Sequence, residues 1–115
     1  EVLSIMKDPE FKALFGPGSL AEVPINGMIG DRVVSARIDR LAVSDEKIII
    51  IDYKTNRPPP LNAKSAAPVY LKQMAIYRAL LQKIYPGRKI ACILAWTDTT
   101  RLMVLPDELL DQYAP

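Results

Sequence analysis

The feature that most constrains this chain is a run of four isoleucines, residues 48–51, followed at once by Asp52, Tyr53 and Lys54. A continuous run of β-branched apolar residues predicts a strand buried on both faces, in the middle of a sheet. A buried strand that ends in a carboxylate and an ammonium group indicates a site that needs both. Because side chains alternate along a strand, Asp52 and Lys54 are expected on the same face, roughly 6–7 Å apart at their Cα atoms.

A second acid, Asp39, lies in another strand-like run, residues 37–41. Two acids on adjacent strands offer hard oxygen ligands to a divalent metal, and a neighbouring lysine can stabilise developing negative charge. The alternative for Asp39 is a structural ion pair with Arg37, which shares its face of the strand, whereas Arg40 points the other way. The sequence therefore predicts a candidate site made of Asp39, Asp52 and Lys54.

Turn, cap and periodicity signals divide the rest of the 115 residues into elements of a single domain spanning 1–115. Pro24 makes the first strand an edge strand, and Pro86-Gly87 ends the long helix. Leu71, Met74, Leu81 and Ile84 are expected to supply much of the buried face of that helix. The expected elements are a helix from Asp8-Pro9-Glu10, strands over 20–29, 33–43, 48–54, 89–96 and 101–105, a proline-rich loop over 56–67, a helix over 68–85 and a last helix from Pro106. This order predicts an α/β fold in which the long helix connects two strands of one mixed sheet.

Three motifs in order, Asp39, Asp52-Tyr53-Lys54 and Gln73-Met74-Ala75-Ile76-Tyr77, make the chain resemble the RecB-like branch of the PD-(D/E)XK nucleases. Further stretches are similar to the C-terminal nuclease domain of AddA-type helicase–nuclease subunits: residues 21–25, 52–59 and 96–98. The resemblance covers the chain from about Phe15 to its end. It implies a restriction-endonuclease-like αβββαβ core, a mixed central sheet flanked by helices.

The resemblance also implies roles for the site residues. Asp39 and Asp52 would be metal ligands, the Tyr53 backbone carbonyl a third oxygen donor, and Lys54 the group that orients the attacking water or stabilises the transition state. Magnesium or manganese suits such an oxygen-only ligand set. Glu22 has a less direct role in the family, as an occasional ligand or a residue that orients one, and its alternative is a surface acid on an edge strand.

The charge distribution predicts a nucleic-acid surface. Net charge is only +2, yet no acid occurs between Tyr53 and Thr97, a segment rich in lysine and arginine. The alternative is a solvated helix face with loops, but beside two carboxylates a phosphate-binding surface is favoured. The candidate contacts are Lys64, Lys72 and Arg78, with Gln73 and Tyr77, which share a helix face with Tyr70 and are otherwise packing residues.

The implied function is a magnesium-dependent deoxyribonuclease, with exonuclease activity in bacterial recombinational DNA repair. Its partners would be DNA, the helicase portion of the same chain and a second subunit of the complex. No apolar run is long enough to cross a bilayer, and the lone Cys92 fits a buried thiol in a reducing cytoplasm.

One departure from the family concerns histidine. RecB-like nucleases usually bring a metal-binding histidine from an upstream helix, and this sequence contains none. The start at Glu1 favours a piece of a longer chain, which by itself would be weakly active or inactive. The competing interpretation is a non-catalytic DNA-binding or subunit-docking module that retains the nuclease fold.

Overall fold

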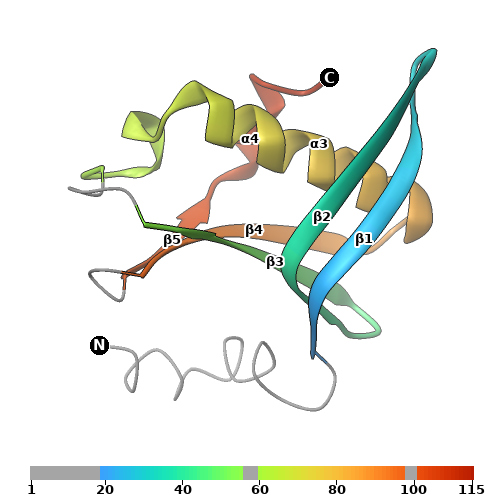
Figure 1. Ribbon diagram of the computed structural model, residues 1–115, viewed down its shortest axis with the longest axis horizontal. Helices are drawn as coiled ribbons and strands as arrows, with labels where there is room; N and C mark the ends of the chain where they lie inside the picture. The colour runs from blue at the N-terminus through green and yellow to red at the C-terminus, as the bar shows by residue number, and fades with distance from the viewer. Residues whose placement is uncertain (1–18, 56–59, 98–100) are drawn as a thin grey trace.

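Five strands form one mixed sheet in the order β1-β2-β3-β4-β5 (Figure 1). The computed structural model describes residues 19–55, 60–97 and 101–115. The elements are β1 (Ser19–Ile29), β2 (Arg32–Val43), β3 (Lys47–Lys54), a 3-10 turn η2 (Ala63–Ser65), α3 (Pro68–Ile84), β4 (Lys89–Trp96), β5 (Arg101–Leu105) and α4 (Asp107–Asp111). The helix predicted from Asp8, and the parts of the predicted loops at 56–59 and 98–100, lie outside the described residues.

The strand directions follow from the connections. Strands β1, β2 and β3 form an antiparallel meander, and β4 pairs with β5 in the antiparallel sense. Strand β3 runs parallel to β4, because α3 carries the chain back across the sheet before β4 begins. The predicted mixed α/β fold is confirmed, and β1, which contains Pro24, is an edge strand as expected.

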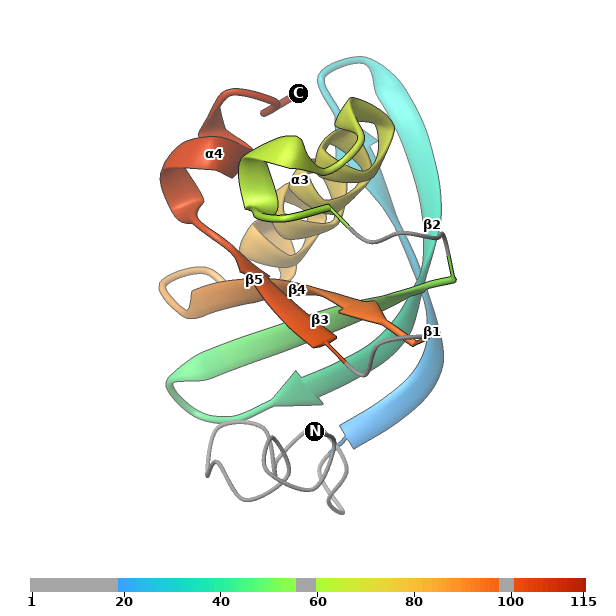
Figure 2. The same ribbon diagram turned by 90° about the vertical axis from the view of Figure 1, so that its left-hand side faces the viewer.

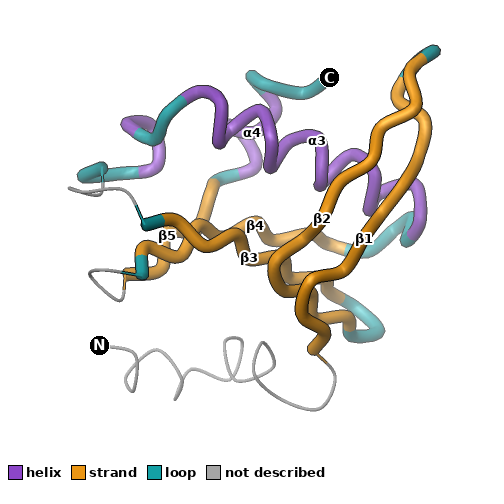
Figure 3. Tube along the Cα trace, viewed as in Figure 1, coloured by secondary structure: helices purple, strands orange, loops and turns teal. Residues whose placement is uncertain are grey.

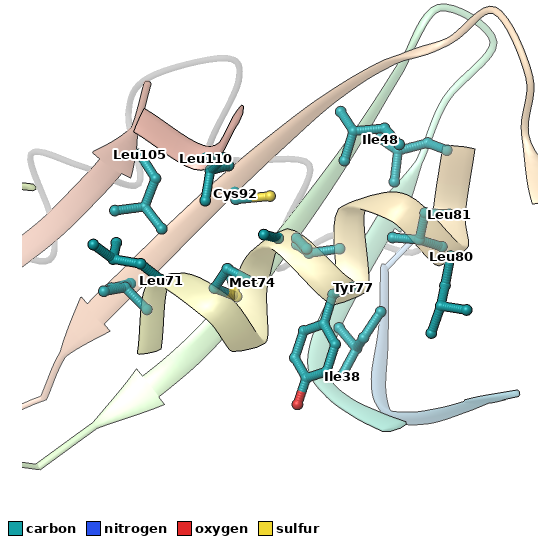
Figure 4. Packing of buried hydrophobic residues seen from close by; sticks show 14 of the residues in the cluster. Ile38, Ile48, Leu71, Met74, Tyr77, Leu80, Leu81, Cys92, Leu105 and Leu110 are labelled. Carbon is teal, nitrogen blue, oxygen red and sulfur yellow. The ribbon is translucent and has the colours of Figure 1, made fainter. Parts of the chain in front are cut away.

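Strand β3 is buried on both faces, as its isoleucines predicted. Ile48 and Ile50 belong to the main core beneath α3 and α4, while Ile49 and Ile51 join a smaller cluster with Ile93 on the other face. Figure 2 shows both helices on the same side of the sheet, and Figure 4 shows the α3 side chains that fill the main core. By alternation, Asp52 and Lys54 continue the face of Ile48 and Ile50 and so point toward α3.

Strand β2 leaves β3 halfway along its length. Its pairing with β3 stops at Arg40 opposite Ile51, whereas its pairing with β1 continues to the hairpin turn. The β1–β2 ribbon therefore rises from the plane of the other strands and runs beside α3 (Figures 1 and 3). Ile38 and Leu41 are both buried in the main core, although strict alternation would place them on opposite faces, because the strand bends between them.

The ribbon packs closely against α3 at Gly27. A Cβ atom at this position would lie 2.7 Å from Leu80 Cδ2, so only glycine allows the present approach of strand and helix. The Lys83 ammonium also donates to the Met28 carbonyl. These contacts hold the ribbon against the C-terminal half of α3.

Other predictions about single residues have mixed outcomes. Trp96 and Cys92 are buried as expected, and burial raises the pKa of the Cys92 thiol to about 12. The prediction that Ile84 is buried is wrong: its side chain is 50% exposed, because the final turn of α3 lies at the rim of the core. Within the described part of the chain, no helix has the length and apolar character needed to span a membrane.

Candidate active site

The carboxyl end of β3 delivers an acid and a lysine to one point under α3. Asp52 Oδ2 lies 2.5 Å from Lys54 Nζ, and the two side chains are only 7% and 13% exposed. The preceding isoleucines anchor the strand in the core and so fix the backbone positions of both residues. Sequence reasoning placed these two residues on one face, and the structure brings them into direct contact.

Asp39 reaches the same point from β2. Its carboxylate Oδ2 accepts a hydrogen bond from the Tyr53 backbone N–H at 2.8 Å. Asp39 comes directly before Arg40, the first residue of β2 that pairs with β3. Its side chain therefore accepts from a β3 N–H that the pairing with β2 leaves free. The divergence of the two strands thus makes room for the Asp39 carboxylate beside Asp52.

The Asp52 carboxylate is buried and lies near a second carboxylate, and both conditions disfavour its ionised form. Burial raises its pKa from 3.8 to about 6; the neighbouring Lys54 opposes this rise, and the Asp39 carboxylate adds to it. The Lys54 ammonium therefore offsets only part of the cost of ionising Asp52. A further positive charge at this point would favour the ionised form of both acids.

A short chain of contacts holds Lys54 from the α3 side. Its Nζ donates to Gln73 Oε1 at 3.2 Å and lies 4.0 Å from the centre of the Tyr70 ring. Gln73 Nε2 then donates to the Tyr77 hydroxyl at 2.8 Å, so the amide carbonyl and amide nitrogen each meet the partner they require. Burial and the nearby Asp52 raise the pKa of Tyr77, which keeps its hydroxyl protonated. Tyr77 and Tyr70 thus do more than pack.

Tyr70 is supported in turn by the core. Its ring centre lies 6.3 Å from that of Trp96, with the planes tilted by 58°, which is an ordinary aromatic pair. Figure 4 shows Tyr77 beside Ile38, with its hydroxyl directed away from the apolar cluster. The helix face that carries Tyr70, Gln73 and Tyr77 therefore turns toward the crevice, as the i, i+3 and i+7 spacing allows.

The residues present fit a hard divalent cation. Two carboxylates converge where one of them carries a raised pKa, and oxygen donors of this kind suit magnesium or manganese. Among the described residues, no three histidine, cysteine, aspartate or glutamate side chains gather as a metal-binding group. The Tyr53 backbone carbonyl stays a predicted third ligand, and magnesium commonly keeps several waters beside one or two carboxylates.

Glu22 does not join the carboxylate pair in this structure. Its side chain is 76% exposed and lies 4.0 Å from the Arg37 guanidinium. Its backbone has φ of 52°, a left-handed conformation that is unusual for a residue with a side chain. The expected alternative of Asp39 paired with Arg37 is not what the structure shows, since Asp39 bonds to the Tyr53 N–H and Arg37 approaches Glu22.

The predicted basic contacts separate into two groups. Lys64 on η2 and Lys72 on α3 are exposed, as a phosphate-binding role requires. Arg78 is buried, with Nη2 2.7 Å from Asp111 Oδ1 and Nη1 3.5 Å from Asp107 Oδ1. Its assignment to a nucleic-acid surface is therefore corrected, because its guanidinium fastens α4 to α3.

Sequence reasoning missed the open groove that continues from the site. The groove lies between β2 and α3, and Gln73 and Tyr77 line it together with residues of both elements. The pattern of strands and helices does not predict the groove, because it depends on how far the β1–β2 ribbon rises from the sheet. The spacing of Val69, Gln73 and Ile76 on α3 was the only available signal.

The chain resembles known proteins in its sequence family and in its fold. Residues 6–105 match the family model described as the PD-(D/E)XK nuclease superfamily. Among curated protein sequences, none matches the chain significantly.

Two solved structures share the fold. One is a crystal structure described as a candidate exonuclease from Eubacterium rectale, with a TM-score of 0.63, 17% identity, and coverage of 97% of this chain and 45% of the other. The second, SSO0001, has a TM-score of 0.50 and 18% identity, with coverage of 96% and 51%. The chain thus spans about half the length of each.

Proposed function

This chain belongs to the PD-(D/E)XK nuclease superfamily, and from that premise we propose that it is a magnesium- or manganese-dependent deoxyribonuclease domain. Nucleases of this superfamily generally use divalent metals. The observation that carries the proposal is the convergence of a buried Asp52, its partner Lys54 and a half-buried Asp39 at the end of β3. A largely buried pair of Lys54 and Asp52 has no structural necessity, because well-packed apolar side chains are often as stabilising or more so at such a place.

We further propose that the domain belongs to an AddA-type helicase–nuclease of bacterial recombinational repair, where it would act as an exonuclease. The support is the likeness of residues 21–25, 52–59 and 96–98 to that group. The helicase portion of the same polypeptide and a second subunit would then be its partners, and the cytoplasm its location.

In the proposed reaction, water attacks a backbone phosphodiester and the bond to the leaving oxygen breaks. Asp39, Asp52 and the Tyr53 carbonyl would hold a divalent cation, which would supply Lewis-acid polarisation of the phosphoryl oxygen and a more acidic attacking water. The Lys54 ammonium donates to the phosphoryl oxygens as negative charge builds on them. Gln73 and Tyr70 keep that ammonium aimed at the crevice when it leaves Asp52.

Lys64 and Lys72 are proposed to bind phosphates of the DNA away from the reacting bond. Both are exposed, and they lie on η2 and α3, the elements that follow the site along the chain. Such contacts position the nucleic acid without selecting sequence.

The proposal is tested with labelled linear DNA and the full-length protein, with and without Mg²⁺. Asp52→Asn should abolish metal-dependent cleavage while the protein stays folded. Asp45→Asn, which changes the same residue type in the exposed hairpin loop, should cut at the wild-type rate. If the wild-type protein binds DNA yet releases no product at any magnesium or manganese concentration, the nuclease proposal fails and the non-catalytic module is favoured.

A further inference from the structure

An open groove of about 610 Å³ runs from the candidate site between β2 and α3. Its inner end shares Gln73 and Tyr77 with the contacts that hold Lys54. A molecule in the groove therefore touches the residues that position the proposed catalytic lysine. The groove and the site form one continuous surface.

The walls of the groove are mostly aliphatic. Val34 and Ala36 contribute from β2, and Val69 and Ile76 from α3. Val34, Ala36 and Ile76 rest on the main core, so these parts of the walls are firmly backed. Val69, at the start of α3, is 66% exposed, so its apolar side chain faces water and is not part of the core. Such a surface suits a flat, weakly polar group.

The charged residues of the groove are both cationic. Arg37 on β2 and Lys72 on α3 line it, and no acid is among its lining residues. Arg37 lies 4.0 Å from the Glu22 carboxylate, but both side chains are exposed, so this ion pair contributes little. A ligand that combines an apolar flat part with negative charge complements this arrangement.

We propose that the groove is a nucleobase subsite: it takes one unstacked base of the DNA strand being cut, with Arg37 and Lys72 on the flanking phosphates. This inference rests on the proposed nuclease function and adds to it a contact with a base. The volume is that of a small-molecule pocket, about 300–1,000 Å³, which suits a nucleotide or two and not a base-paired duplex. Bases out of a duplex are commonly held by apolar or aromatic walls, with cations on the backbone.

The subsite links base binding to the reaction. The amide of Gln73 and the hydroxyl of Tyr77 stand at its inner end and can meet the edge of a base. Because the same Gln73 holds Lys54, a base seated in the groove favours the lysine position needed at the neighbouring phosphate. A strand with a missing base at this place loses that contact, although its phosphates are intact.

The test uses the full-length protein and single-stranded oligonucleotides that carry one abasic residue at successive positions around a defined cleavage point. The expected result is one position, close to the cut phosphate, at which removing the base lowers kcat/KM about tenfold. Neighbouring abasic positions should have little effect, because their phosphates still bind.

Variants then locate the effect. Ala36→Leu narrows the groove and should bring the rates on intact and abasic strands close together. Should Ala36→Leu fail to fold, Val69→Leu gives the same comparison from an exposed position. Val104→Leu, at a similarly exposed valine on β5, should keep the wild-type ratio.

If the wild-type protein cuts all the abasic strands with the same kcat/KM as the intact strand, the subsite proposal is wrong and the nuclease function stands. The same conclusion follows if a folded groove variant keeps the full dependence on the base. If the wild-type protein cuts no strand in Mg²⁺ or Mn²⁺, it is the proposed function that fails, and the subsite fails with it.

Discussion

Replacing Asp52 by asparagine is expected to stabilise the metal-free protein at neutral and alkaline pH. Burial raises the pKa of Asp52 from 3.8 to about 6, with Asp39 adding to the rise. In the folded state the ionised carboxylate is therefore disfavoured relative to the unfolded chain. Asparagine keeps nearly the same shape and carries no charge, so this cost disappears.

The sign and size follow from the two pKa values. Below about pH 4 the carboxyl is protonated in both states, and ionisation costs nothing. Between pH 3.8 and about 6 the unfolded chain ionises while the folded protein keeps its proton, so the cost grows, and above the folded pKa it levels off at roughly 3 kcal/mol, at about 1.4 kcal/mol per pKa unit. Between pH 4 and pH 8 the difference in unfolding free energy, Asp52→Asn minus wild type, should increase by roughly 2 kcal/mol. This free-energy difference already includes the ion pair with Lys54, because Lys54 lowers the folded-state pKa of Asp52 from which the difference is calculated.

The assay is urea unfolding followed by circular dichroism in EDTA, at several pH values, with equal m-values required of both proteins. Asp45→Asn serves as control, since that residue is exposed in the loop between β2 and β3. A difference that stays constant with pH, or that shrinks as the pH rises, would refute the assignment of Asp52 as a carboxylate strained by burial.

With Mg²⁺ in place of EDTA, the same unfolding assay should show that most of this stability difference is removed. A cation that binds only the folded wild-type protein adds about 2.7 kcal/mol at a hundred times its Kd. Asp52→Asn lacks one of the two carboxylate ligands and should gain far less. Equal stabilisation of both proteins by Mg²⁺ at pH 8 would place the metal elsewhere.

Three further predictions concern other residues. Lys54→Ala should bind DNA nearly normally yet cut on the order of a hundredfold more slowly, and Lys54→Arg should not restore the rate, because a planar guanidinium cannot replace a compact ammonium; equal losses of affinity and rate would make Lys54 a simple phosphate contact. Lys72→Ala and Lys64→Ala should each make the slope of log DNA affinity against log salt concentration shallower by nearly one. Arg78→Ala should leave that slope unchanged, but it should lower the free energy of unfolding by about 2 kcal/mol, because its contacts with α4 are lost. Glu22→Gly should raise the free energy of unfolding by about 1 kcal/mol, because glycine accepts a φ of 52° without strain, and a loss of stability would show that the Glu22 side chain holds the strand.

The sequence by itself determined the secondary-structure elements and the strand face that carries Asp52 and Lys54. Four consecutive isoleucines can be buried on both sides only in a central strand, and the alternation that follows places Asp52 and Lys54 on one face. Pro24 confines its strand to the edge, and the long helix before Lys89 requires a parallel return to the sheet. Each of these conclusions depends on the covalent geometry and burial of neighbouring residues, which are local properties.

Tertiary structure decided how the site is completed. The bend of β2 frees the Tyr53 N–H for Asp39 and opens the groove beside α3, and neither follows from periodicity. Arg78 looks like any other base in an acid-free segment, but it meets two acids of α4 that are about thirty residues later in sequence. Whether a charged side chain binds phosphate or another part of the chain depends on which distant elements pack against it, and that is fixed only when the whole core forms.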